Sequence, residues 1–305
     1  MQPHIFKHLQ PGMAKEALDR ISTDTCLEPP DKEQRDRENT RFWRTICGSS
    51  LAHRLGATDN SPRSLCVFDT YYLSYYSYLY DWLPVQGLAG KDVLEVGLGF
   101  GTVGQLLSSA RANYTGLDIA AEPVGLMNLR LQSLGLPGHA VEGSILDAPF
   151  PERSFDYVVA IGSLHHTGDV ERAIAEVSRV LRPGGRLIMM VYYAYSYRMW
   201  IKRKLRLFKD LLLDVGGVSS YTGDPDERAM YDTNLQGQPA PNTVFLSKRQ
   251  LRRIARRSGL RVERASPQNA HVSLPLRLLG FTRDRALKTW ARYIGTDLYA
   301  VLKKR

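Results

Sequence analysis

The sequence has few cysteines and no long apolar run. Its 305 residues include only Cys26, Cys47 and Cys66, whose wide spacing gives neither a disulfide framework nor a zinc-ligand pattern. We therefore expect free thiols and no metal; a soft-metal site using all three is an alternative that the spacing does not support. No stretch approaches the ~18 apolar residues of a membrane span, and the first residues lack a signal-peptide apolar region. These absences predict a cytoplasmic protein.

Residues 92–101 are the most informative stretch of the chain. They combine a short apolar strand, a carboxylate at Glu95, and glycines at the alternate positions Gly97, Gly99 and Gly101. Apolar residues suit a buried parallel strand, and glycines let the backbone turn sharply and approach a ligand closely. The stretch therefore predicts the floor of a cofactor site.

The register of the glycines distinguishes two classes of cofactor. In a dinucleotide fingerprint the first glycine follows the strand directly, and Thr102 would then occupy the third glycine position. A carboxylate at Glu95 would repel a pyrophosphate but suits the ammonium of an amino-acid cofactor. Asp118 ends the next expected strand, at about the separation of 20 residues where a carboxylate meets ribose hydroxyls. These residues favour S-adenosylmethionine, with helix capping as the alternative role for both acids.

Six segments in this order resemble one known family. The family is the class I S-adenosylmethionine-dependent methyltransferases, specifically the type 11 group that includes the ubiquinone and menaquinone methyltransferases, and the resemblance covers about residues 88–193. The matching segments are Val93–Gly101, Gly116–Asp118, Gly143–Ile145, Ala148–Asp156, Leu164–His166 and Val180–Gly185.

The resemblance also implies roles for individual residues. Leu98, Ile119 and Ile145 would flank the nucleoside, while the three glycines would contact the methionine and ribose portion. The chain departs from the family pattern at Ser144, where an aspartate that binds the adenine amino group is usual.

Strands and helices alternate from residue 92 onward, which predicts a parallel α/β sheet covered on both faces. We expect a Rossmann-like, doubly wound sheet of seven strands, and the resemblance implies that the last strand is antiparallel beside 186–193. The expected strands are 92–96, 114–118, 139–143, 155–161, 186–193, 261–265 and 297–302. The expected helices are 102–110, 122–134, 170–181, 248–258 with Ser247 as its cap, and one near 283–293. Residues 1–87 would form an N-terminal helical cap, and residues 88–305 the methyltransferase domain, with a helical insertion at 194–243.

The expected cap contains an aromatic run, residues 69–83. Tyr72, Tyr76 and Tyr80 share a stripe at helical spacing, so the cap could line an aromatic or sugar-like pocket or simply pack on the sheet. The preceding residues 28–41 are almost wholly polar and fit a linker or an exposed helix.

The formal net charge of +10 is concentrated in two segments. Residues 248–257 predict an ordinary sheet-covering helix with a solvated basic face. Residues 197–213 predict a basic amphipathic helix, which fits a lid over the active site, a contact to an acidic substrate, or a peripheral membrane contact.

Two sets of residues are candidates for chemistry. In the loop 162–169, His165 and His166 titrate near neutrality and are candidates for a base or a substrate contact, unless one of them only holds the loop. Asp169 has the pattern of a helix N-cap. Asp232 and Asn234 in the insertion form a second set, which turn chemistry explains equally well.

We therefore expect methyl transfer to an oxygen or nitrogen of a small-molecule or glycan-like acceptor in a biosynthetic pathway, with carbon as a further option. Methylation of RNA or protein is an alternative suggested by the positive charge, although no nucleic-acid-binding motif accompanies it, so no nucleic acid partner is expected. A non-catalytic cofactor-binding or membrane-associated accessory protein is another. A homodimer remains open.

Overall fold

The computed structural model describes residues 32–46, 48–201, 221–222, 224–272, 277 and 280–305. Cys26, Cys47 and most of the predicted helix 197–213 lie outside these residues. Chain contacts divide the protein into residues 1–35 and 36–305. Of the first unit only the start of helix α2 (Lys32–Trp43) is described, and all other described elements belong to the second.

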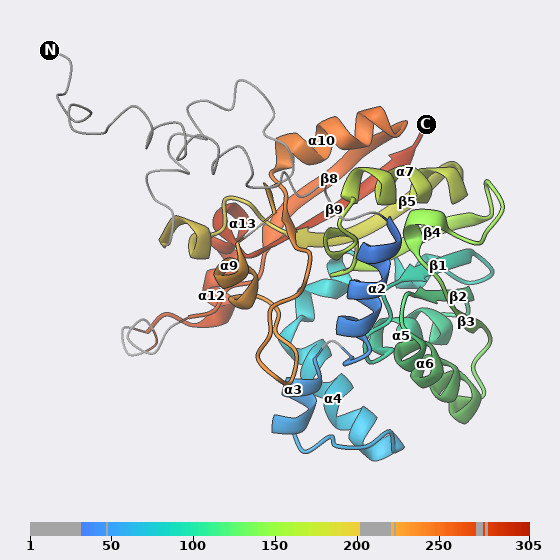
Figure 1. Cartoon of the computed structure of the whole chain (residues 1–305), viewed down its shortest axis with the longest axis horizontal. Helices are drawn as coiled ribbons and strands as arrows, with labels where there is room; N and C mark the ends of the chain where they lie inside the picture. Colours follow the sequence, from blue (N-terminus) through green and yellow to red (C-terminus); the bar gives the residue numbers. More distant parts are fainter. Residues whose placement is uncertain (1–31, 47, 202–220, 223, 273–276, 278–279) are drawn as a thin grey trace, which may run out of the picture. The chain divides into compact units, whose positions relative to one another are not determined.

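A seven-stranded sheet forms the centre of this second unit, in the order β3-β2-β1-β4-β5-β9-β8 (Figure 1). The first five strands pair in parallel, whereas β9 runs antiparallel to both β5 and β8. This confirms the predicted doubly wound sheet with its last strand reversed. The strands are β1 (Asp92–Val96), β2 (Asn113–Asp118), β3 (His139–Glu142), β4 (Phe155–Ile161), β5 (Leu181–Tyr192), β8 (Leu260–Gln268) and β9 (Asp297–Lys304).

Helices cover both faces of the sheet because successive strand residues point to opposite sides. Leu94 and Val96 of β1 pack in the cluster that includes α7 (Val170–Val180) and α10 (Lys248–Arg257). Val93 packs on the other face, with α5 (Thr102–Ser109) and α6 (Ala121–Leu134) (Figure 1). β1 is therefore buried on both faces, as the apolar run predicted.

Two predicted helix caps are confirmed. Asp169 accepts a hydrogen bond from the Arg172 backbone N–H at 3.0 Å and caps α7. Ser247 caps α10 in a reciprocal capping box with Gln250. The helix expected near 283–293 is instead two short ones, α12 (Arg283–Lys288) and α13 (Ala291–Ile294).

The predicted tyrosine stripe is interrupted. After α3 (Ser49–Arg54), helix α4 (Pro62–Tyr75) ends because Tyr76 leaves the helical conformation, with ψ at 42°. The chain continues in two 3₁₀ turns, η1 (Ser77–Asp81) and η2 (Val85–Gly87). Tyr72 and Tyr76 still contact each other, with ring centroids 4.8 Å apart, but Tyr80 is 49% exposed. The stripe therefore consists of two tyrosines, not three.

The predicted insertion 194–243 is described in part. Among its described residues, 197–201 are helical and Pro225–Ala229 form helix α9. Strand β6 (Tyr221–Thr222) pairs with β7 (Val244–Phe245), which follows the insertion. Of the helices that the structure describes, none combines the length and apolarity needed to cross a bilayer.

A buried ion pair joins α4 to the sheet-covering helices. The Arg130 guanidinium of α6, only 2% exposed, donates to the two Asp69 oxygens at 2.8 and 3.0 Å and to Gln105 of α5 at 2.5 Å. Asp69 also accepts from the Thr102 hydroxyl at 2.6 Å, at the first residue of α5. Asp69 therefore links α4 to the helix that follows the glycine turn.

We predict that Asp69→Ala lowers the free energy of unfolding by about 3 kcal/mol, because Arg130 would keep its charge in a buried site without its partner. Asp81→Ala, which removes an exposed carboxylate, should change it by less than about 0.5 kcal/mol. Urea denaturation of the two variants measures both values. Equal effects would mean that the ion pair does not hold α4 in place.

Candidate active site

A cavity of about 250 Å³ opens at the carboxyl ends of the central strands. The loops after β1, β2, β3 and β4 contribute Gly97 to Phe100, Asp118 and Ile119, Gly143 to Ile145, and Gly162 and Ser163. In open α/β sheets, ligands bind at this edge. The structure thus brings the cofactor residues predicted from separate parts of the sequence to one cavity, except Gly101, which lies outside the lining.

In the glycine turn, residues 97–101, the backbone lies close to neighbouring residues. At Gly97 φ is 81°, and a Cβ would collide with the Ser163 Cβ, so a side chain is excluded on conformational and steric grounds. Gly99, with φ at 50°, has no atom within 4 Å of such a Cβ. Gly101, which ends the turn, also has a positive φ of 77°. The turn therefore presents bare backbone to the cavity at Gly97 and Gly99, the two of these glycines that line it.

Asp118 holds this turn from the neighbouring strand. Its Oδ2 accepts a hydrogen bond from the Leu98 backbone N–H at 2.8 Å, and its Oδ1 accepts from the Ala120 N–H at 3.0 Å. Burial raises the pKa of Asp118 to about 6, although these hydrogen bonds act in the opposite direction. The N-cap of α6 is Ala120, so the alternative capping role of Asp118 is not realised. A carboxylate can accept further hydrogen bonds, and Asp118 lines the cavity.

Glu95 lies almost fully buried in the cavity wall, 3% exposed. The Tyr114 hydroxyl donates to its Oε2 at 2.5 Å. Burial raises the pKa of Glu95 to about 8, more than the hydrogen bond from Tyr114 lowers it. A ligand ammonium beside Glu95 would favour the ionised carboxylate again. This environment fits the amino-acid portion of the predicted cofactor.

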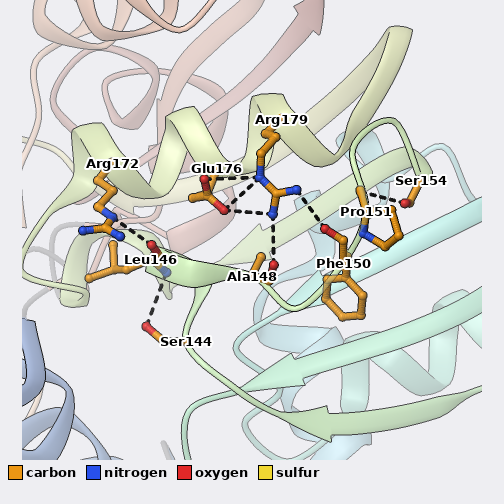
Figure 2. Close-up of polar contacts among 9 residues, drawn as sticks. All are labelled: Ser144, Leu146, Ala148, Phe150, Pro151, Ser154, Arg172, Glu176 and Arg179. Atoms are coloured by element: carbon orange, nitrogen blue, oxygen red, sulfur yellow. Dashed lines mark hydrogen bonds and ion pairs between the residues drawn. The ribbon is translucent and has the colours of Figure 1, made fainter.

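Hydrogen bonds join the loop that carries Ser144 and Ile145 to α7 (Figure 2). Arg172 donates to the Leu146 carbonyl oxygen at 2.8 Å, and Arg179 donates to the carbonyl oxygens of Phe150 and Ala148 at 2.8 and 2.9 Å. Ser144 Oγ accepts from the Leu146 N–H at 3.3 Å and so caps a short 3₁₀ turn. The two arginines thereby position Ser144 and Ile145 in the cavity wall.

Leu98, Ile119 and Ile145 supply apolar surface to the same wall. Leu98 and Ile145 are 4% and 5% exposed, and Ile119 is half-buried. Their placement fits the flanking of a nucleoside.

The two histidines lie in different environments. His165 is fully buried outside the cavity lining, and neither ring nitrogen has a hydrogen-bond partner among the described residues. Burial, with a smaller effect from His166, holds the pKa of His165 well below its usual value. His166 lines the cavity. Of the two candidates, only His166 is placed to meet an acceptor.

His166 is part of a polar network that includes the insertion. Its Nε2 lies 3.3 Å from Asp232 Oδ2, and its Nδ1 lies 2.9 Å from the Asn242 carbonyl oxygen and 3.3 Å from Thr243 Oγ1. The Tyr192 hydroxyl donates to the same Asp232 oxygen at 2.5 Å. Turn chemistry therefore does not fully account for Asp232, which lines the cavity.

Aromatic side chains form much of the remaining cavity lining. Trp43 and Tyr192 lie beside His166, whereas Phe68 stacks on Phe100 of the glycine turn. Those outside the glycine turn come from α2, α4 and the segment after it, and from β5 and β9: Trp43, Phe68, Tyr72, Tyr76, Tyr192 and Tyr299. Sequence reasoning missed Tyr192 and Tyr299. The position of Tyr192 at the carboxyl end of a parallel strand could have identified it, whereas Tyr299 lies within a reversed strand.

Within the described ranges, no group of three or more histidine, cysteine or acidic side chains gathers in a way that could hold a metal ion.

Comparison with known proteins agrees with this site. The methyltransferase domain family matches residues 94–189. A fatty-acid O-methyltransferase of Mycolicibacterium smegmatis is 35% identical over 145 residues, which are 46% of this chain and 50% of that protein. A demethylmenaquinone methyltransferase of Thermus thermophilus is 28% identical over 165 residues, 51% of this chain and 71% of that protein. A solved S-adenosylmethionine-dependent methyltransferase from Methanosarcina mazei has the same fold, with a TM-score of 0.51 at 19% identity over 75% of this chain and 97% of that one.

The match of the family over the strands and loops that build the cavity defines a methyltransferase domain. Residues 94–189 form a class I S-adenosylmethionine-dependent methyltransferase domain of the type 11 group, and S-adenosylmethionine is the cofactor of this family. The predicted methyltransferase domain, its family and its cofactor are therefore confirmed. The chain spans only half the length of the Mycolicibacterium relative, so the activity of the whole protein is a matter for proposal.

The pKa of about 8 at Glu95 predicts a pH-dependent stability. The unfolded chain releases this proton near the ordinary value of 4.5, but the folded protein retains it. Stability should therefore fall as the pH rises from about 5 to about 8. Glu95→Gln cannot titrate and should lose this part of the slope.

Urea denaturation across this pH range tests the prediction, with Glu152→Gln, an exposed glutamate, as the control. Parallel stability curves for wild type and Glu95→Gln would contradict the raised pKa.

Proposed function

We propose that the protein transfers the methyl group of S-adenosylmethionine to an oxygen or nitrogen nucleophile of a small-molecule acceptor. One observation supports this most directly. A single cavity is lined both by the glycine turn with Glu95 and Asp118 and by aromatic side chains with His166 and Asp232. The cavity therefore offers a place for a cofactor and for a second, apolar molecule.

The two groups of residues would have different tasks. Asp118 would accept hydrogen bonds from the ribose hydroxyls, Glu95 would pair with the ammonium, and Leu98, Ile119, Ser144 and Ile145 would enclose the nucleoside. The cofactor supplies an electrophilic methyl group on a sulfonium. The protein then has to align the nucleophile in line with that methyl and exclude water, which the aromatic side chains favour.

The relatives suggest the kind of acceptor. The names of the relatives specify a fatty acid in one case and demethylmenaquinone in the other. Both molecules have a large apolar body, and the aromatic side chains of this cavity suit such a body. We therefore propose a lipid-like or ring-bearing acceptor.

The remaining expectations stay predictions. They are the helical cap 1–87 with the insertion 194–243, a cytoplasmic location, a homodimer, and a membrane contact or lid function of residues 197–213.

Binding of S-adenosylhomocysteine tests the proposal. Titration calorimetry of the full chain should give a dissociation constant on the order of micromolar. Asp118→Ala should weaken binding by about 100-fold, because it removes the ribose acceptor and the hydrogen bond that holds Leu98. Asp226→Ala, at an exposed acid outside the cavity lining, should bind like the wild type.

A chain that binds a nicotinamide dinucleotide but not S-adenosylhomocysteine would refute the assignment. Thermal melting of Asp118→Ala separates a lost contact from a lost fold.

A further inference from the structure

The cavity is lined by acids. Its described lining includes four carboxylates, Asp36, Glu95, Asp118 and Asp232, but no lysine or arginine. Among these described lining residues, only His166 can carry a positive charge. Like charges repel strongly where water is partly excluded. The lining acids that the cofactor does not use, Asp36 and Asp232, therefore disfavour an anionic acceptor, and the lining is compatible with a neutral one.

Asp232 is the acid best placed for the acceptor. The proposed function assigns Glu95 and Asp118 to the cofactor, whereas Asp232 lines the cavity in contact with His166 and Tyr192. Tyr192 and His166 both contact Asp232 Oδ2, while no described residue donates a hydrogen bond to Oδ1. The side chain is 17% exposed, against 5% for His166. Oδ1 therefore retains its capacity to accept a hydrogen bond from a ligand.

His166 is less suited to accept a proton. Its Nε2 faces Asp232, and its Nδ1 faces the Asn242 carbonyl and the Thr243 hydroxyl. Both ring nitrogens therefore face protein groups, and Nε2 can form a hydrogen bond to the Asp232 carboxylate only when it carries a proton. His166 instead fixes the orientation of the Asp232 carboxylate from one side, while the Tyr192 hydroxyl fixes it from the other.

We propose that Asp232 Oδ1 accepts the hydrogen bond, and then the proton, of a neutral hydroxyl on a ring-bearing acceptor, and that the cavity rejects carboxylate acceptors. This inference rests on the proposed function. An oxygen lone pair of the acceptor forms the new bond to the methyl carbon as the carbon–sulfur bond breaks and its electrons neutralise the sulfonium. The hydroxyl proton passes to Asp232 and later to solvent. A phenol suits this step, since its pKa of about 10 is far below that of an alkyl alcohol.

A matched pair of probes tests the charge preference. 4-Hexylphenol and 4-hexylbenzoate have the same ring and tail and differ in the head group. With the full chain saturated with S-adenosylhomocysteine, fluorescence of Trp43, which lines the cavity, or calorimetry reports their binding. The wild type should bind the phenol at least about tenfold more tightly than the benzoate. Asp232→Asn should strengthen benzoate binding at least about tenfold.

Turnover tests the proton transfer. S-adenosylhomocysteine release with 4-hexylphenol should fall about 100-fold in Asp232→Asn. Asp226→Asn, which removes the same charge from the same stretch of chain outside the lining, should match the wild type in both assays.

The outcomes separate this inference from the proposed function. If the wild type does not bind S-adenosylhomocysteine, the proposed function fails. If the cofactor product binds but the benzoate binds as tightly as the phenol, or neither probe binds, only the acceptor class is overturned. If the wild type binds 4-hexylphenol without methylating it, or Asp232→Asn methylates it at the wild-type rate, Asp232 is not the proton acceptor. The comparison of the two probes on the wild type needs no variant and remains decisive if Asp232→Asn fails to fold.

Discussion

The hydrogen bond from the Leu98 N–H to the Asp118 carboxylate joins the turn after β1 to the end of β2. The turn can take this shape only because Gly97 has no side chain to meet Ser163, on the loop after β4. Three neighbouring strand ends therefore meet at one point of the sheet edge. The cavity forms there because the backbone of the turn is held close to both neighbours and is left uncovered.

The acids of the cavity have an energetic cost without a ligand. Burial raises the pKa of Glu95 to about 8 and that of Asp118 to about 6, so the protein without ligand opposes ionisation of both. A ligand that carries an ammonium and donates hydrogen bonds offsets this penalty. On the aromatic side of the cavity, His166 Nε2 lies 3.3 Å from Asp232 Oδ2. In our proposals, cofactor selection and acceptor selection both depend on the carboxylates of the lining.

Local patterns could predict the sheet and the cofactor site, because β1, the glycine turn and Asp118 lie within a short stretch of sequence and each has a distinct signal. The proposed acceptor site depends on contacts between distant residues. Tyr192 and Asp232 lie 40 positions apart in the sequence and meet only in the folded chain. Adjacent histidines cannot be ranked from sequence, because the 3₁₀ turn Leu164–His166 buries one and exposes the other to the cavity. The predicted stripe of three tyrosines was wrong because the ψ angle of Tyr76 is not helical, so α4 ends at Tyr75.

The net charge of +10 illustrates why composition is a poor guide to this acceptor. The arginines of α10 contribute to this net charge. The same helix buries Leu251, Ile254 and Ala255 against the sheet. The described cavity lining, by contrast, contains no lysine or arginine. A basic surface around an acidic cavity is consistent with a cationic cofactor held inside. The net charge therefore reflects the outer surface of the protein. Inferences about the acceptor have to start from the residues that line the cavity.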